Sequence, residues 1–158
     1  MHPVYYSGSI FYVTPYAEHG RVYHLRADQQ GIVAQHVWTS PLDTVTGGAV
    51  LVDGTLFAAG YKRSKWWFGV DWQTGQTKYE LKDLTTGAAI YADERLYCLD
   101  ERGTVALLKA GTYGLEIVTC FRLLTDSVSD AWAHPVLNDG RLYIRYHDTL
   151  WCYDVRKR

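Results

Sequence analysis

Cysteine is scarce in this chain of 158 residues, and the few cysteines that occur are not grouped. There are three, Cys98, Cys120 and Cys152, and no pair has the Cys-x-x-Cys spacing. An odd number at such spacings argues against a disulfide framework and against a cysteine-rich metal site. Because free cysteine is among the most buried residue types, we expect buried thiols in strands.

Long apolar runs and an excess of basic residues are also missing. No stretch approaches the roughly eighteen apolar residues of a transmembrane helix. Sixteen Lys and Arg against seventeen Asp and Glu give a formal net charge of −1. This balance argues against a nucleic-acid binder and against a polybasic membrane anchor. Residues 1–4 lack the features of a secretion signal, so we expect a cytosolic protein or a signal outside this sequence.

Aromatic residues are plentiful, with thirteen Tyr and six Trp, and they favour strands and large packed surfaces. Four segments also share one pattern, a tight turn followed by a short apolar strand. Gly8, Gly54, Glu94 and Gly140 occupy this turn at intervals of 46, 40 and 46 residues. A period of about 40 to 46 residues is that of one four-stranded blade in a β-propeller.

Each repeat predicts antiparallel strands. Asp53-Gly54 and Asp139-Gly140 are strong hairpin signals, because a type I′ turn needs positive φ at both central residues. Glu94 in the third repeat predicts a turn that differs in type or strain. Strands such as 105–108 and 150–153 are apolar on both faces, which indicates sheets stacked face to face.

The sequence therefore predicts an all-β fold, a β-propeller of about four four-stranded antiparallel blades. We expect residues 1–158 to form a single partial ring. The predicted repeats are 2–47, 48–87, 88–133 and 134–158, and the last of them lacks its fourth strand.

One segment resembles a known blade motif. Residues 69–79 are similar to the Ala-x-Asp-x-x-x-Gly-x-x-x-Trp motif of pyrroloquinoline-quinone-type (PQQ-like) β-propeller repeats, with Tyr79 in place of Trp. Repeats one and three contain degraded forms of the motif. The first keeps Ala27, Asp28 and Gly31, with Trp38 as the docking aromatic. The third keeps Gly111 and Phe121 but has Lys109 where the motif has Asp.

The resemblance carries expectations about architecture and location. The family usually builds eight-bladed rings, so the chain would be half of one. It contains quinoprotein alcohol dehydrogenases and non-enzymatic members, such as the propeller lipoprotein that scaffolds outer-membrane protein assembly. Residues 132–136 and 140–145 resemble the last blade of bacterial proteins in the second group. This implies the C-terminal half of a longer propeller, in the periplasm or another extracytoplasmic compartment.

The ligands of a quinone site are not present as a set. The quinoprotein dehydrogenases carry adjacent cysteines over the cofactor and a Glu, Asn and Asp group that holds calcium. This chain has no adjacent cysteines, and its only Asn is Asn138, in a predicted hairpin. His24 and His36 could lie near each other, but zinc needs a third ligand that the sequence does not place beside them. We therefore expect no catalytic residues, no metal and no cofactor.

Candidate binding residues lie on predicted loops, because rigid sheets usually present function on their loops. In a propeller, the second-to-third and fourth-to-first strand connections share one face. The basic and aromatic run 61–66 suits an anionic or aromatic partner through charge-assisted hydrogen bonds and cation–π contact. The structural alternative is a solvated loop with its Trp packed against the blade. The candidate binding residues are His19, Tyr61, Lys62, Arg63, Lys65, Trp66, Trp132 and His147.

We interpret the chain as a non-catalytic scaffold that binds a protein or a small polar ligand through its loop face. Two alternatives stay open: part of a quinone-dependent dehydrogenase whose cofactor site lies in a missing half, and a carbohydrate-binding propeller. An isolated arc of four blades would leave apolar faces and strand edges open. We therefore expect a homodimer that closes an eight-bladed ring, or a missing N-terminal half.

Overall fold

The computed structural model describes residues 3–13, 19–111, 114–123 and 129–156. In these ranges the chain forms strands and no helix, as the sequence predicts. Sheet 1 contains β1 (Val4–Tyr6), β2 (Ser9–Val13), β3 (Gly20–Asp28) and β4 (Gly31–Ser40), and sheet 2 contains β5 (Val50–Val52), β6 (Thr55–Ala59), β7 (Trp67–Asp71) and β8 (Thr77–Leu81). Sheet 3 contains β9 (Gly87–Ala92), β10 (Arg95–Asp100), β11 (Thr104–Gly111) and β12 (Gly114–Arg122), and sheet 4 contains β13 (Val136–Asn138), β14 (Arg141–Tyr146) and β15 (Thr149–Asp154).

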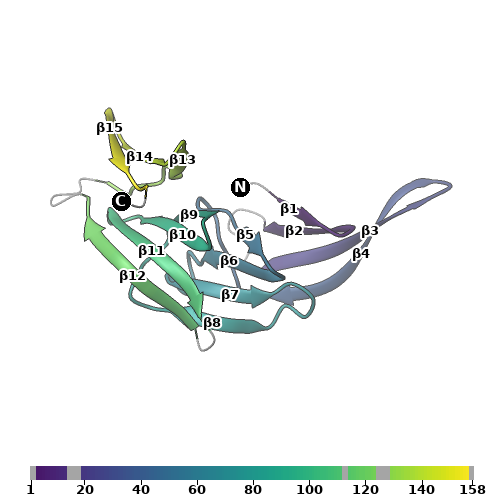
Figure 1. Cartoon of the computed structure of the whole chain (residues 1–158). Coiled ribbons are helices and arrows are strands. Elements are labelled where there is room, and N and C mark those ends of the chain that lie inside the picture. Colours follow the sequence, from purple (N-terminus) through teal and green to yellow (C-terminus); the bar gives the residue numbers. More distant parts are fainter. Residues whose placement is uncertain (1–2, 14–18, 112–113, 124–128, 157–158) are drawn as a thin grey trace.

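The sheets succeed one another in chain order (Figure 1). In each of them the hydrogen-bonded neighbours are consecutive antiparallel strands. The first strands of successive sheets touch, β5 with β9 and β9 with β13, while the outer strands β8 and β12 also touch. Sheet 4 has three strands in the described part of the chain, so β15 has one unpaired edge there. No helix long and apolar enough to cross a membrane occurs in the described ranges.

The tight turn has the same backbone conformation in every repeat. Its two central residues have positive φ in all four sheets: Ser7 and Gly8, Asp53 and Gly54, Asp93 and Glu94, and Asp139 and Gly140. The expected difference in turn type at Glu94 is therefore not found. Glu94 instead adopts the left-handed conformation, with φ of 58°, at the position where the other repeats have glycine. The left-handed conformation strains the backbone of any residue other than glycine.

Hydrophobic clusters fill the spaces between successive sheets and hold them together through burial of apolar surface. Phe11 and Trp38 belong to the cluster between sheets 1 and 2, and Phe57 and Leu108 to the cluster between sheets 2 and 3. Leu99 and Ile144 belong to the cluster between sheets 3 and 4. Sheets 2 and 3 therefore each have one face packed on the preceding sheet and one on the following sheet, which explains strands such as 105–108 that are apolar on both faces.

The three cysteines do not share one environment. Cys98 is buried in the cluster between sheets 2 and 3, where burial raises the pKa of its thiol. Cys120 and Cys152 are exposed. The expectation of buried thiols is correct for Cys98 and wrong for the other two. Cys152 lies on β15, the end strand of sheet 4, and Cys120 lies on β12, the end strand of sheet 3, and solvent reaches both.

A β-bulge marks the same place in sheets 1, 2 and 3. The register between the third and fourth strands shifts after Val22, Gly69 and Leu107, whose partners are Trp38, Tyr79 and Thr119. Trp38, Tyr79 and Thr119 are therefore equivalent residues. The blade motif predicts Phe121 at this position. Phe121 instead pairs with Val105, two residues further along, and its ring meets Tyr153 of sheet 4 edge-on at 5.3 Å.

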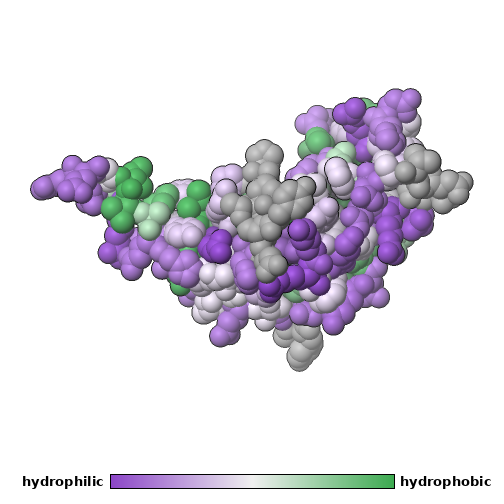
Figure 2. Space-filling model, turned by 180° about the vertical axis from the view of Figure 1, so that it is seen from behind, coloured by the Kyte–Doolittle hydropathy of each residue, from purple (hydrophilic) through white to green (hydrophobic). Residues whose placement is uncertain are grey.

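The β3–β4 hairpin projects from the rest of the molecule (Figure 1). Its hydrophilic tip is followed by hydrophobic residues, visible at the left of Figure 2. Ile32, Val33 and Val37 are exposed on β4. Asp28 closes the tip by accepting the N–H of Gln30 at 2.7 Å.

Candidate functional site

Strand direction divides the connections into two opposite faces. The links between second and third strands, and between successive sheets, lie on one face, which we call the loop face. The links between first and second strands, and between third and fourth strands, lie on the other, which we call the hairpin face. All eight sequence-predicted binding residues belong to loop-face connections or border them.

The basic run of the loop face is held by a buried carboxylate. Asp43, from the link between sheets 1 and 2, is 3% exposed. Its oxygens accept the backbone N–H groups of Tyr61 and Lys62, each at 2.8 Å, and of Arg63 at 3.1 Å. Because these bonds fix the backbone, the exposed side chains of Lys62 and Arg63 extend from a rigid base. Sequence reasoning missed Asp43, which no local motif distinguishes from other loop aspartates.

Trp66 is a packing residue of this loop. It is half-buried, packs against the cluster between sheets 1 and 2, and lies 5.8 Å from the ring of Phe68. The ammonium of Lys82 lies 5.0 Å from the centre of its ring. Trp66 is therefore packed against the blade, which is the alternative to a binding role that the sequence allows, and Lys82 adds a cation–π contact to its ring.

Glu101 connects the basic loop with sheets 3 and 4. Its buried carboxylate accepts a hydrogen bond from Thr85 at 3.2 Å and lies 3.7 Å from the Lys65 ammonium. Its carbonyl accepts the N–H of Ala131 at 2.9 Å. The side chain of Lys65 is 59% exposed, so its ion pair contributes little stability. The hydrogen bonds of Glu101 instead join the 129–132 segment to Thr85 in the link between sheets 2 and 3.

A hollow of about 310 Å³ opens beside Lys65 and carries mostly positive charge. Its charged lining residues are Lys65, Lys82, Arg102, Arg122, Asp83 and Asp100. Asp100 is committed to the turn that follows it, because its carboxylate accepts the N–H groups of Arg102 and Thr104. Lys65 is paired with Glu101 and Lys82 with Glu80, so Arg102 and Arg122 are the cations that favour an anionic group in this hollow.

Trp132 and His147, far apart in sequence, meet in a second hollow of the loop face. This hollow has a volume of about 270 Å³ and is also lined by Arg145 and Tyr146. Ser129 holds its wall through hydrogen bonds to His147 Nε2 at 3.0 Å and to the Tyr146 hydroxyl. His19 lies directly before β3, half-buried, and lines neither hollow. The eight predicted residues thus form two groups and one separate residue.

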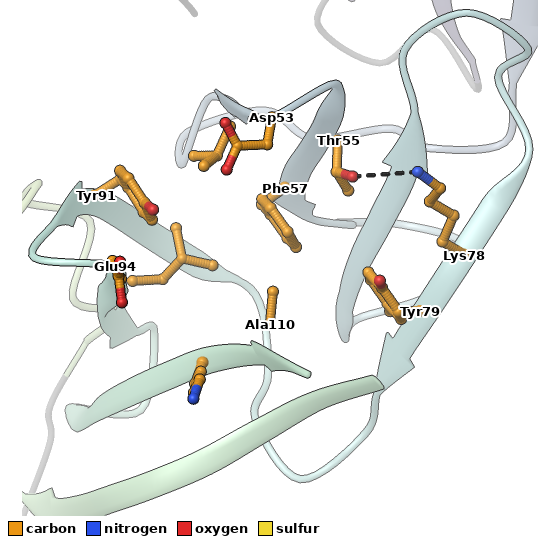
Figure 3. Close-up of a pocket in the computed structure, with 11 residues that line it drawn as sticks. Asp53, Thr55, Phe57, Lys78, Tyr79, Tyr91, Glu94 and Ala110 are labelled. Atoms are coloured by element: carbon orange, nitrogen blue, oxygen red, sulfur yellow. Dashed lines mark hydrogen bonds between the residues drawn. The ribbon is translucent and has the colours of Figure 1, made fainter. Parts of the chain in front are cut away.

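The hairpin face holds a cleft that sequence reasoning missed. It has a volume of about 440 Å³ and lies between sheets 2 and 3 (Figure 3). Phe57 and Tyr79 form one wall, Ala110 lies opposite, and Asp53 and Glu94 stand at the two hairpin turns. Two signals for the cleft were present in the sequence: Glu94 in a glycine position, and Gly69 inside a strand, where glycine often marks a close approach.

Lys78 of this cleft is held in place by its neighbours. Its ammonium lies 3.1 Å from the Asp71 carboxylate and donates to the Thr55 hydroxyl at 3.5 Å. Burial tends to raise the pKa of Asp71, but hydrogen bonds from Thr74 and Lys78 outweigh it and lower that pKa. Asp71 is therefore ionised at neutral pH and fixes Lys78 at the edge of the cleft.

Comparisons with known proteins address the fold. No protein-family model matches the chain, and no curated protein matches it. The chain is similar to the crystal structure of BamB from Moraxella catarrhalis, with a TM-score of 0.68 and 14% sequence identity. The match covers 95% of this chain and 41% of that one, so the chain spans about two fifths of its length. The fold is that of a β-propeller. The prediction of that architecture is confirmed.

Proposed function

We propose that this chain is a non-catalytic propeller scaffold whose loop face binds a protein or a small polar ligand through anionic groups. The observation that supports this most is the basic loop 61–66. Three backbone N–H groups bind the buried carboxylate of Asp43, so the loop is ordered before any partner arrives. Pre-ordering lowers the entropic cost of binding. The positively lined hollow beside Lys65 extends the same surface.

The test is fluorescence anisotropy with a labelled Asp/Glu-rich peptide and a matched Asn/Gln peptide. Replacing Lys62, Arg63 and Lys65 together by Ala should weaken binding of the acidic peptide, most strongly at low salt. Thermal stability should hardly change, because these side chains are exposed. The control variant replaces three exposed cations elsewhere by Ala: Arg26, Lys109 and Arg141. Equal loss in both variants would contradict the proposal.

The proposed relationship and location rest on the blade motif in residues 69–79 and on the fold. We infer that the sheets are pyrroloquinoline-quinone-type repeats with the boundaries predicted above, and that the protein acts outside the cytoplasm, as the propeller lipoprotein of outer-membrane assembly does. Fractionation of cells that express the full open reading frame tests the location. Recovery in the cytosol alone would contradict it.

The end sheets support the proposed homodimer. The outer face of sheet 1 exposes Tyr5 and Tyr12, and that of sheet 4 exposes Val136 and Leu150. Two-fold pairing would place each outer sheet 1 against a partner's sheet 4 and close a ring of eight sheets. Light scattering after size exclusion should give twice the chain mass, and Leu150→Lys should give the monomer. A wild-type monomer that binds no dye for exposed apolar surface would overturn the dimer.

A further inference from the structure

The cleft on the hairpin face has an aromatic wall. Phe57, Gly69 and Tyr79 are direct cross-strand neighbours on β6, β7 and β8. A Cβ at Gly69 would lie 2.5 Å from the Tyr79 ring and 3.2 Å from the Phe57 ring, so both rings lie over this glycine. The two rings are parallel within 2°, with centres 6.5 Å apart. Phe57 is 4% exposed and Tyr79 is half-buried, so the ring that a ligand can reach at this wall is that of Tyr79, which packs on the bare backbone of Gly69.

The polar groups of the cleft are balanced in charge. Asp53 and Glu94 supply carboxylates, and Lys78 and Lys109 supply ammonium groups. The Asp53 and Glu94 carboxylates form no ion pair or hydrogen bond within the described residues. They are therefore available to accept hydrogen bonds, and the lysines can donate them. A lining that has carboxylates and ammonium groups suits a ligand that has both hydrogen-bond donors and acceptors.

The backbone conformation of Glu94 indicates that its side chain has a role other than stabilising the turn. The matching turn position holds Gly8, Gly54 or Gly140 in the other repeats, and each has positive φ. Glu94 adopts φ of 58° there, at the cleft (Figure 3). Strained residues of this kind gather at binding sites, where the side chain is needed despite the conformation. Tyr91, which is 41% exposed, adds a second exposed ring to the same cleft.

We propose that this cleft binds a neutral carbohydrate of one or two pyranose units. The C–H face of a pyranose ring stacks on the accessible rings of the cleft, those of Tyr79 and Tyr91, and its hydroxyls bond to the Asp53 and Glu94 carboxylates and to Lys78. A volume of about 440 Å³ lies within the range of small-molecule sites. The site is separate from the loop face and does not depend on the function proposed for that face.

Saturation-transfer NMR with glucose, galactose, N-acetylglucosamine, maltose and cellobiose tests the proposal, with lysine and glutamate as charged probes. At least one saccharide should receive saturation from the protein and shift the methyl signals of Val52 and Leu96, which line the cleft. Tyr91→Ala should weaken that binding about threefold to tenfold. Glu94→Gln and Glu94→Gly should weaken it about tenfold, since a bond to a charged acceptor is lost.

Two controls keep the test specific. Tyr6→Ala removes another exposed tyrosine, from sheet 1, and should leave saccharide binding unchanged. The Lys62, Arg63 and Lys65 triple variant should also keep it, which separates this site from the loop face. The proposal is overturned by a wild type that binds none of the saccharides, or by one that binds only lysine or glutamate. Binding that survives both Tyr91→Ala and Glu94→Gly would overturn it as well.

Discussion

At the hairpin face, the interface between sheets 1 and 2 is closed, whereas the interface between sheets 2 and 3 opens into the cleft. In the first, Trp38 donates its indole N–H to the carbonyl of Trp72 at 2.8 Å, and its ring lies against Gly75. In the second, the equivalent Tyr79 lies over Gly69 of its own sheet and lines the cleft. The residue at this position of the repeat thus contributes to whether adjoining sheets seal or leave a cavity.

The hairpin of the following sheet, which faces the aromatic ring, contributes to this difference between the two interfaces as much as the ring itself does. In sheet 2 the Asp71 carboxylate accepts the N–H groups of Gln73 and Thr74, which curls the turn into a surface on which Trp38 docks. In sheet 3 the corresponding residue is Lys109, paired with Glu116 in a hairpin that continues to Gly111. The extended hairpin gives Tyr79 no such surface.

Removing the docking ring should have the largest effect. Trp38→Ala should lower the free energy of unfolding by about 3–5 kcal/mol, because Trp38 is 6% exposed and loses both packing and its hydrogen bond. Tyr79→Ala should cost only about 2 kcal/mol, because Tyr79 is half-buried beside a cavity. Urea denaturation of both variants measures the difference. Equal losses would show that the two interfaces are packed alike.

Adding a methyl group to the docking surface should have the next largest effect. A Cβ at Gly75 would lie 2.7 Å from the Trp38 ring, and φ there is +73°. Gly75→Ala should therefore cost about 2–3 kcal/mol through strain and overpacking. Gly54→Ala is the matched control, with φ of +72° and no atom within 4 Å, and should cost about 1 kcal/mol. If the two costs agree in thermal melts, the Trp38 contact has no part in the effect.

Glu94→Gly should act in the opposite direction. Relief of the left-handed backbone, less the greater freedom of glycine in the unfolded chain, should stabilise the protein by about 0.5 kcal/mol. The melting temperature should rise while saccharide binding in the cleft falls. A lower melting temperature would show that Glu94 supports the turn itself.

The smallest expected effect is the dependence of the free energy of unfolding on acidic pH through Asp71. The folded-state pKa of Asp71 is lowered below its ordinary value of 3.8, so its charge stabilises the fold above that pH. This contribution is lost as pH falls through the lowered folded-state value. Asp71→Ala should therefore be less stable than wild type at neutral pH, and the gap should narrow in strong acid. Urea midpoints across that pH range measure it, and a constant gap would contradict the assignment.

The fold was predictable because its signals are local. Asp53-Gly54 and Asp139-Gly140 mark hairpins by themselves, and Trp38 was expected to dock from its place in the repeat. The cleft was not predictable, since it depends on a bulge that moves Thr119 into the row of Trp38 and on the hairpin of the next sheet. The basic loop was found from its composition, but Asp43, which orders it, lies eighteen residues before Tyr61.

The uninterrupted sequence of neighbouring strands has a kinetic consequence. In the described ranges, each ladder joins consecutive strands. Chain segments there need close only short loops to pair, which favours rapid folding compared with all-β proteins whose partners are distant in sequence. Each sheet can form as a local unit and then add to its neighbour. Sheet 4, with three strands and one packed face in the described chain, should open first, and its amide hydrogens should exchange before those of sheets 2 and 3.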